Sequence, residues 1–305
     1  MPSTLFFAIL WFLFVRIDSE GFDHHFKKFL MKNYGVKPLQ AFARDDIENT
    51  GSFGGGITNE SYRAVVLVHG LSNQAGNFWK IRRDFVAAGF PKAKIFATTY
   101  GEGEASSFLG FGDAMKCEYV KQIRSFIEVI AAYSERKVDV IGYSMGAPIS
   151  RKAILGGKCV DTNEDLGPAL SNIIHTYISV AGPNQGSELC NMEMDDYEIC
   201  NSNNGLVCGS DFLNDINSRE RYEGMVSYSL ASKKDQMIGY TVCDKKSAHF
   251  AGARDIEFDR LYHEQVEFDT AETQLKILRQ HKEDIVSSSN VLCFMSVFIS
   301  VLLLL

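Results

Sequence analysis

The sequence contains no dense run of lysine or arginine, and its acidic residues outnumber its basic ones. Its 305 residues include 38 Asp and Glu against 31 Lys and Arg, so the formal net charge at pH 7 is -7. Proteins that bind nucleic acid neutralise phosphates with a basic stripe or patch. The lack of such a stripe argues against a nucleic-acid partner.

The close cysteine spacings of metal sites are also missing. The sequence has no C-x-x-C pair and no histidine cluster beside a cysteine, so we predict no metal site. Of its seven cysteines, Cys293 lies in the C-terminal tail. The others are Cys117, Cys159, Cys190, Cys200, Cys208 and Cys243. An even six in a secreted chain predicts up to three disulfides, for which about fifteen pairings exist.

No uninterrupted apolar run is long enough for an ordinary membrane-spanning helix, which needs about 20 residues. Leu5–Val15 is continuous and apolar, and its length is typical of a signal-peptide core, although no Lys or Arg precedes it. We therefore predict that residues 1–19 are a removed signal peptide and that the chain is secreted. A retained anchor is the alternative.

The C-terminal tail, residues 291–305, is apolar but short for a spanning helix. Small polar residues precede it, and four of them are candidate attachment sites for a lipid: Ser287, Ser288, Ser289 and Asn290. This pattern is typical of a GPI-attachment signal, although its polar spacer is short. A tail anchor and a tail folded against the body are the alternatives. Near the other end, Asn59 begins the single N-x-S/T sequon and is a candidate glycosylation site.

Between the two ends, apolar β-rich runs alternate with helical patterns. We predict strands in 64–70, 93–100, 137–144, 173–182 and 225–232, and helices in 77–90, 119–133, 147–157 and 270–280. Alternation at this spacing indicates an α/β fold with a mostly parallel sheet and helices on both faces. We assign residues 20–290 to one domain, in which the polar, cysteine-containing residues 185–223 form an insertion.

One serine stands in a motif that carries chemistry. Ser144 lies between Gly142 and Gly146 in "GYSMG", directly after the strand "VDVI" and before a helical pattern. In a G-x-S-x-G turn the glycines leave room for neighbouring elements, and the serine hydroxyl is held out at the end of the sheet. The context favours Ser144 as a nucleophile over a serine that merely lies in a glycine-rich loop.

A serine hydroxyl needs a base, and in this arrangement the acid and the histidine follow the serine in the chain. His263, in a polar stretch expected to be a loop before the last helix, is our preferred base, and His249 is the competitor. Asp235, just past the predicted strand 225–232, is the preferred acid. Asp244 and Asp255 are the alternatives to it.

The negative charge that forms when an ester carbonyl is attacked needs hydrogen-bond donors. The backbone N–H of the residue after the nucleophile supplies one, here Met145. The loop after an earlier strand supplies the other. In "LVHGLSN" the strand closes at His69 and Gly70, so we predict that the Leu71 N–H is this second donor.

With these residues in place, the chain resembles the α/β-hydrolase superfamily and, more narrowly, the class 2 lipases. It is particularly similar to secreted nematode relatives of the small bacterial lipases. The resemblance runs from about Phe26 to Gln280 and includes the strings "VLVHG", "GYSMGAPISRKAILGG" and "VAGPNQG". Tyr143 is a departure, because many lipases carry histidine there. The apolar tail is another.

The resemblance implies a hydrolase of carboxylic esters that requires no cofactor. Its expected substrates are acylglycerols at a lipid–water interface. It implies Ser144, Asp235 and His263 as the triad and Leu71 and Met145 as the oxyanion donors. Membrane attachment through the C-terminus is a further expectation. Two other functions fit the same sequence: a non-catalytic surface binding protein on a hydrolase scaffold, and a thioesterase or acyltransferase.

Overall fold

The computed structural model describes residues 21–48, 50–103, 114–191 and 197–280. The predicted signal peptide (1–19) and the apolar tail (291–305), with its candidate attachment residues, lie outside the described residues. Their roles therefore stay predictions from the sequence. In the described part of the chain, no helix is both long enough and apolar enough to cross a membrane.

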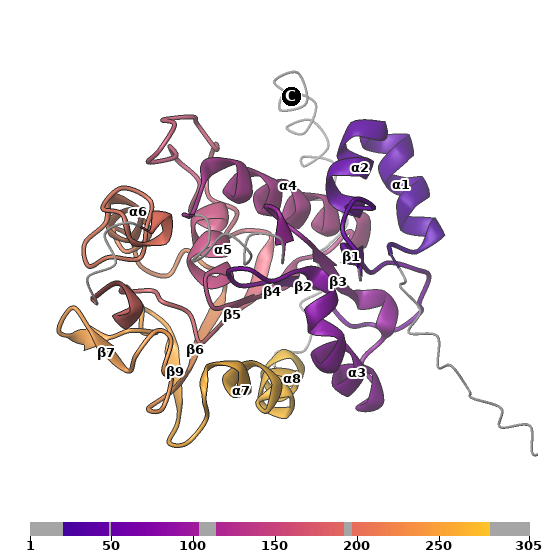
Figure 1. The fold of residues 1–305 in the computed structure, drawn as a ribbon. Coiled ribbons are helices and arrows are strands. Elements are labelled where there is room, and N and C mark those ends of the chain that lie inside the picture. The colour runs from indigo at the N-terminus through magenta and orange to yellow at the C-terminus, as the bar shows by residue number, and fades with distance from the viewer. Residues whose placement is uncertain (1–20, 49, 104–113, 192–196, 281–305) are drawn as a thin grey trace, which may run out of the picture.

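A seven-stranded sheet forms the centre of the molecule (Figure 1). Its spatial order is β1-β3-β2-β4-β5-β6-β9, and all neighbours are parallel except the pair β1 and β3. The strands are β1 Ser52–Phe53, β2 Val65–Val68, β3 Ile95–Thr98, β4 Val138–Tyr143, β5 Ile174–Val180, β6 Val226–Ser232 and β9 Arg254–Phe258. A separate hairpin pairs β7 Thr241–Val242 with β8 Lys245–Lys246.

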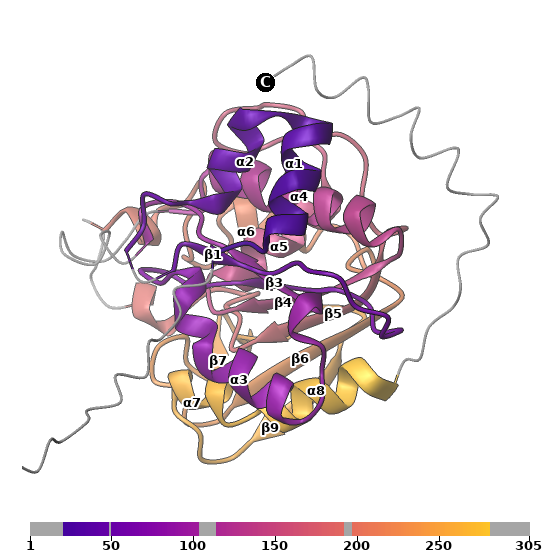
Figure 2. The same ribbon diagram turned by 90° about the vertical axis from the view of Figure 1, so that its right-hand side faces the viewer.

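Helices cover the sheet on both faces, as the alternating sequence predicts. The helices are α1 His24–Tyr34, α2 Val36–Ala43, α3 Trp79–Ala87, α4 Cys117–Ser134, α5 Gly146–Leu155, α6 Asp211–Ile216, α7 His263–Phe268 and α8 Ala271–Gln280. Figures 1 and 2 show α1, α2, α4 and α5 on one face and α3, α7 and α8 on the other. Two buried apolar clusters lie accordingly, one on each side of the sheet.

The predicted strands and helices are all present, and the α/β-hydrolase fold class is confirmed. The sequence did not predict helices α1, α2, α6 and α7, the short strands β1, β7 and β8, or strand β9 of the central sheet. The side chains of β9 are exposed or only half-buried, because it lies at the edge of the sheet and pairs only with β6. Its alternation is limited to two half-buried apolar residues, Ile256 and Phe258, which is too short a pattern to distinguish a strand from a loop.

Three disulfides join the six cysteines of the described chain. The pairs are Cys117–Cys159, Cys190–Cys200 and Cys208–Cys243. The predicted maximum of three disulfides is therefore reached. The pairing itself came from the tertiary structure, since sequence spacing alone does not select one of the fifteen or so arrangements.

Candidate active site

Ser144 occupies the sharp turn between β4 and α5. Its backbone has φ 51°, a left-handed conformation that costs a serine free energy and is found mostly where function requires it. The flanking glycines have a steric cause. A Cβ atom at Gly142 would lie 2.7 Å from Ala147 Cα, and one at Gly146 would lie 2.3 Å from the Val68 carbonyl oxygen. The turn can therefore form only with glycine at both positions.

The sheet topology brings the other candidate residues to the same edge. Ser144 follows β4, Asp235 follows β6, and His263 follows β9. These three strands are parallel, so their carboxyl ends meet at one edge of the sheet. Open α/β sheets bind their ligands at this edge.

The three side chains form one chain of hydrogen bonds. His263 Nδ1 lies 2.8 Å from Asp235 Oδ2, and His263 Nε2 lies 2.9 Å from Ser144 Oγ. An ionised carboxylate only accepts, so the Nδ1–H donates to Asp235 and Nε2 is left to accept from the serine hydroxyl. This is the arrangement that activates a serine nucleophile.

The Asp235 carboxylate is held by its own backbone neighbours. It is buried, and the N–H groups of Met237 and Ile238 both donate to Oδ1 at 3.0 Å. These two bonds fix the position of the carboxylate beside the His263 ring. Asp235 is therefore prepared both to orient the imidazole ring and to stabilise a positive charge on it.

His263 is the first residue of α7, which corrects the expectation that it lies in a loop. The Gln265 side chain caps the start of the helix, because its Oε1 accepts from the Tyr262 N–H at 2.8 Å. The His263 N–H itself donates to Gln236 Oε1 at 3.0 Å. The histidine is thus fixed both by its helix and by the loop that carries the acid.

The competing candidates lie elsewhere. His249 and Asp255 pair with each other, with Nδ1 2.9 Å from Oδ2, and their side chains are 44% and 31% exposed. Asp244 is exposed in the turn between β7 and β8. None of the three is hydrogen-bonded to Ser144, whose side chain meets His263 instead.

The two predicted oxyanion donors flank Ser144. Met145 is the next residue in the chain, and a Cβ atom at Gly70 would lie 2.8 Å from Ser144 Cβ, which shows how closely the Leu71 loop approaches the serine. No described group accepts a hydrogen bond from either the Leu71 or the Met145 N–H. Both N–H groups are therefore free to bind an anionic oxygen.

His69 fixes the peptide between Gly70 and Leu71. The Tyr100 N–H donates to His69 Nε2 at 3.1 Å, so the ring proton sits on Nδ1, which donates to the Gly70 carbonyl at 2.8 Å. Because the described peptide bonds are all trans, the Leu71 N–H points the opposite way from that carbonyl. Burial lowers the pKa of His69 to about 4, which keeps this ring neutral.

Two further buried groups lie near the site: Tyr143, which the sequence marked only as a departure from other lipases, and Glu267, which was not named from the sequence. The Tyr143 ring lies 5.3 Å from the His263 ring, and burial raises the pKa of its hydroxyl. Glu267 is buried one helical turn after His263, and its Oε1 has no hydrogen-bond partner. Burial, followed by the charge of Glu264, raises the pKa of the Glu267 carboxyl well above its usual range. The i, i+4 spacing from His263 was the signal available for Glu267.

Within the described residues, the one group of three potential metal ligands is Cys117, Cys159 and Asp161. The two cysteines are joined in a disulfide, so their sulfur atoms are not thiolate ligands. Asn59, the predicted glycosylation site, is exposed on the surface. Its modification stays a prediction.

The family follows from a comparison with family models. The model described as Lipase (class 2) matches residues 63–276, which is most of the chain. The chain belongs to the class 2 lipase family. Membership of this family supports assignment as a lipolytic hydrolase that cleaves carboxylic esters. A comparison with curated protein sequences gives no match.

Solved structures with a similar fold include lipases and other lipolytic enzymes. The mature form of Bacillus licheniformis lipase BlEst2 has a TM-score of 0.53 at 14% identity, over 74% of this chain and 97% of that chain. A structure titled for the metagenome-derived lipolytic enzymes LipS and LipT has a TM-score of 0.52 at 10% identity, over 77% of this chain and 99% of that chain. At these identities the likeness establishes the fold alone.

Proposed function

We propose that this class 2 lipase is a secreted serine lipase or esterase that hydrolyses carboxylic esters of lipids, with acylglycerols as the substrate class. The observation that carries the proposal is the hydrogen-bonded chain Ser144–His263–Asp235 at a strained turn. The three disulfides support secretion, because disulfides persist in oxidising compartments.

In the first half of the proposed reaction, Ser144 Oγ attacks the ester carbonyl while its proton passes to His263 Nε2. Asp235 stabilises the imidazolium that forms. The backbone N–H groups of Leu71 and Met145 bind the oxyanion of the tetrahedral intermediate. When this intermediate collapses, His263 gives the proton to the leaving alcohol, and the acyl group stays on Ser144.

In the second half, water replaces the alcohol. His263 removes a proton from water, which attacks the acyl-enzyme carbonyl and forms a second tetrahedral intermediate. Its collapse breaks the bond to Ser144 Oγ, and the imidazolium returns its proton to that oxygen. The products are a fatty acid and the free enzyme.

Two exposed aromatic side chains support contact with a lipid–water interface. Trp79 at the start of α3 is 58% exposed, and Tyr262, directly before His263, is 52% exposed. Both follow the carboxyl ends of sheet strands, the edge that carries Ser144. Tryptophan and tyrosine favour boundaries between apolar and aqueous surroundings, because their rings are amphipathic.

A chain-length series of p-nitrophenyl esters, assayed with the wild type and Ser144→Ala, tests the proposal. We expect wild-type hydrolysis and, for the variant, a loss of kcat on the order of 10⁶-fold, as for other serine hydrolases that lose the nucleophile. A fluorophosphonate probe should label the wild type and not Ser144→Ala.

A wild type that hydrolyses no acyl ester and takes up no fluorophosphonate would refute the proposal and favour a non-catalytic binding protein. Labelling with faster turnover of thioesters than of oxygen esters would favour a thioesterase. Ser52→Ala is a suitable control. Ser52 is buried on β1, and its hydroxyl donates only to the Ala43 carbonyl among the groups described.

A further inference from the structure

The loop that carries Asp235 is held from behind by the start of the cysteine-rich segment. We call residues 233–240, between β6 and β7, the acid loop, and the described residues 185–191 and 197–223 the cysteine-rich segment. The Ser187 hydroxyl donates to the Met237 carbonyl at 2.9 Å, and the Glu188 N–H donates to the Ile238 carbonyl at 2.9 Å. Ser187 is buried, so water does not compete for this contact.

These contacts bear directly on the acid. The two residues whose carbonyls are held, Met237 and Ile238, are the ones whose N–H groups donate to Asp235 Oδ1. The Met237–Ile238 peptide is therefore held at both of its polar groups, since its carbonyl accepts from Ser187 and its N–H donates to the Asp235 carboxylate. A shift of the segment would move the donors of Asp235.

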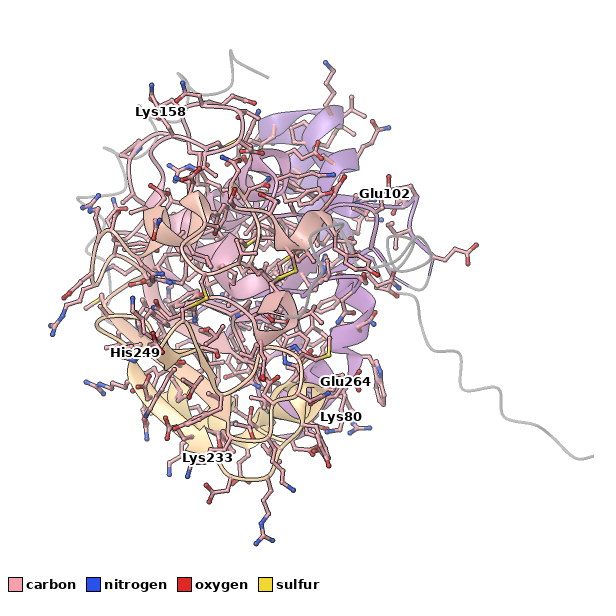
Figure 3. All side chains as sticks on the ribbon, turned by 60° about the vertical axis from the view of Figure 1, so that its left-hand side comes forward. Lys80, Glu102, Lys158, Lys233, His249 and Glu264 are labelled. Carbon is pink, nitrogen blue, oxygen red and sulfur yellow. A yellow bond between two sulfur atoms is a disulfide. The ribbon has the colours of Figure 1, made fainter. Side chains whose placement is uncertain are left out.

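A disulfide also joins the cysteine-rich segment to the chain that follows the acid loop. Cys208, in the cysteine-rich segment, is bonded to Cys243, three residues past the end of the acid loop. Two backbone contacts lie beside it: the Ser187 N–H donates to the Leu206 carbonyl at 3.0 Å, and the Gln185 N–H donates to the Ser247 carbonyl at 2.9 Å. The disulfides are drawn as yellow bonds in Figure 3.

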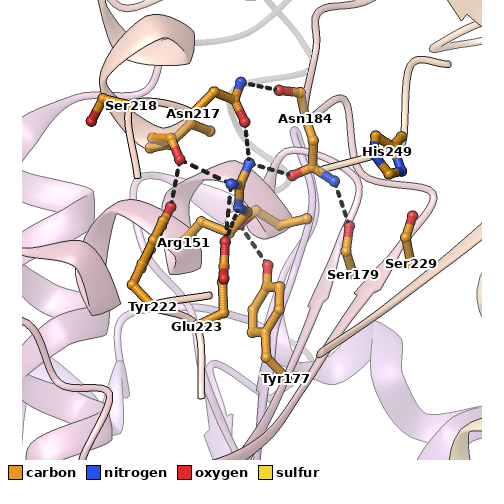
Figure 4. A network of polar contacts seen from close by, with 12 residues as sticks. Arg151, Tyr177, Ser179, Asn184, Asn217, Ser218, Tyr222, Glu223, Ser229 and His249 are labelled. Atoms are coloured by element: carbon orange, nitrogen blue, oxygen red, sulfur yellow. Dashed lines mark hydrogen bonds and ion pairs between the residues drawn. The ribbon is translucent and has the colours of Figure 1, made fainter. Parts of the chain in front are cut away.

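The far end of the cysteine-rich segment is anchored to the helix that follows Ser144. Arg151, on α5, donates to Glu223 Oε1 at 3.0 Å, to Asn217 Oδ1 at 3.0 Å and to the Ile216 carbonyl at 2.9 Å (Figure 4). The Arg151 and Glu223 side chains are 1% and 0% exposed. A buried ion pair with this many hydrogen bonds has a well-defined geometry.

We propose that the cysteine-rich segment is a positioning element of the active site, with Ser187 and the Cys208–Cys243 disulfide as the groups that hold the acid loop in register with α5. The proposal rests on the proposed function of Ser144, His263 and Asp235. None of these groups touches the reacting atoms. They act through the backbone of the acid loop on Asp235, and through Asp235 on the orientation of His263.

Two disulfides of similar loop length provide a matched test. Cys208–Cys243 spans 35 residues and Cys117–Cys159 spans 42, so the chain-entropy contribution of the two to stability is nearly the same. Cys117 and Cys159 lie at α4 and beyond the end of α5, away from the acid loop. We compare Cys208→Ser/Cys243→Ser with Cys117→Ser/Cys159→Ser, and Ser187→Ala with Ser52→Ala, below each variant's unfolding temperature.

We expect the variant without Cys208–Cys243 to lose about 10- to 100-fold in kcat with KM nearly unchanged, because a small misplacement of a catalytic group costs this much. Ser187→Ala should show a smaller loss of kcat. The two controls, Cys117→Ser/Cys159→Ser and Ser52→Ala, should keep wild-type kcat. The far-downfield NMR signal of the His263 Nδ1–H proton should weaken or shift in the two test variants and not in the controls.

Equal losses of kcat in the two disulfide variants would overturn the inference, as would an unchanged Nδ1–H signal in both test variants. If the disulfide variant does not fold, Ser187→Ala decides by itself: wild-type kcat and an unchanged Nδ1–H signal would overturn the inference. A wild type without esterase activity or fluorophosphonate labelling would instead refute the proposed function. The two failures are therefore distinguishable.

Discussion

Two histidine–aspartate pairs lie close together in the C-terminal third of the chain, and they differ in burial and in what the second ring nitrogen meets. Nδ1 lies 2.8 Å from a carboxylate oxygen in His263–Asp235 and 2.9 Å in His249–Asp255. The side chains of the first pair are 7% and 1% exposed, and those of the second are 44% and 31% exposed. Figure 3 shows His249 at the surface.

A histidine–aspartate contact therefore does not by itself identify the catalytic base. His263 Nε2 faces Ser144 Oγ at 2.9 Å, whereas no serine of the described chain is hydrogen-bonded to His249. Burial also strengthens the interaction of Asp235 with a charged imidazole, because water screens it less. A solvated pair such as His249–Asp255 gains little from the same contact.

Replacing each histidine by alanine should give the largest difference in activity between the two pairs. His263→Ala should lower kcat/KM by on the order of 10⁴- to 10⁶-fold, because the serine loses its base. His249→Ala should change it by less than about twofold, since surface substitutions have small effects. Steady-state hydrolysis of a p-nitrophenyl ester measures both. Wild-type activity in His263→Ala would overturn the assignment of the base.

Replacing each aspartate by asparagine tests the same comparison at the acid. Asp235→Asn should lower kcat on the order of 10⁴-fold, since the imidazole loses its counter-charge and the amide can hold it in the wrong tautomer. Asp255→Asn keeps the surface shape, and its kcat should stay close to that of the wild type. A large loss in Asp255→Asn would show that the exposed pair takes part in the reaction.

A third histidine, His69, is buried like His263 but has no carboxylate partner. Burial lowers the pKa of His69 to about 4, against about 6.5 in an unfolded chain. The unfolded state therefore takes up a proton first as the pH falls, so this contribution to stability is complete above pH ~6.5 and is lost progressively towards pH ~4.

His69→Asn keeps a donor for the Gly70 carbonyl and does not titrate. Between pH ~7.5 and ~4.5, the wild type should lose roughly 2–3 kcal/mol more of its free energy of unfolding than this variant does. Urea unfolding at the two pH values measures the difference. An equal loss in both proteins would show that His69 titrates alike in the folded and unfolded states.

Much of the fold could be predicted from the sequence, because its strands and helices carry strong periodic patterns. The buried strand β4, apolar or small at every position except Asp139, and the amphipathic helix α4 are examples. Strand β9 was not predicted, because this short edge strand has only two half-buried apolar residues, Ile256 and Phe258. The start of α7 at His263 was missed for a different reason: its N-cap position holds Tyr262, which is not one of the usual N-cap residues Ser, Thr, Asp and Asn.

The candidate site divides in the same way. The turn around Ser144 is local, so its glycines and the preceding strand could be read directly from the sequence. The choice between His263 and His249 depended on contacts between residues more than a hundred positions apart, such as His263 with Ser144. The only sequence signal for Glu267 was its i, i+4 spacing from His263, and the support of the acid loop by Ser187 had no signal at all.

By itself, the sequence determined the family, the parallel α/β architecture and the position of the serine turn, because short-range sterics and the spacing of apolar residues decide these features. The tertiary structure was needed to show which histidine contacts Ser144, which aspartate contacts that histidine, and how the cysteines pair. It was also needed to show that the cysteine-rich segment is hydrogen-bonded to the acid loop. The reason is physical: such contacts depend on where the ends of parallel strands come together, and strand order is set by packing between segments far apart in the chain.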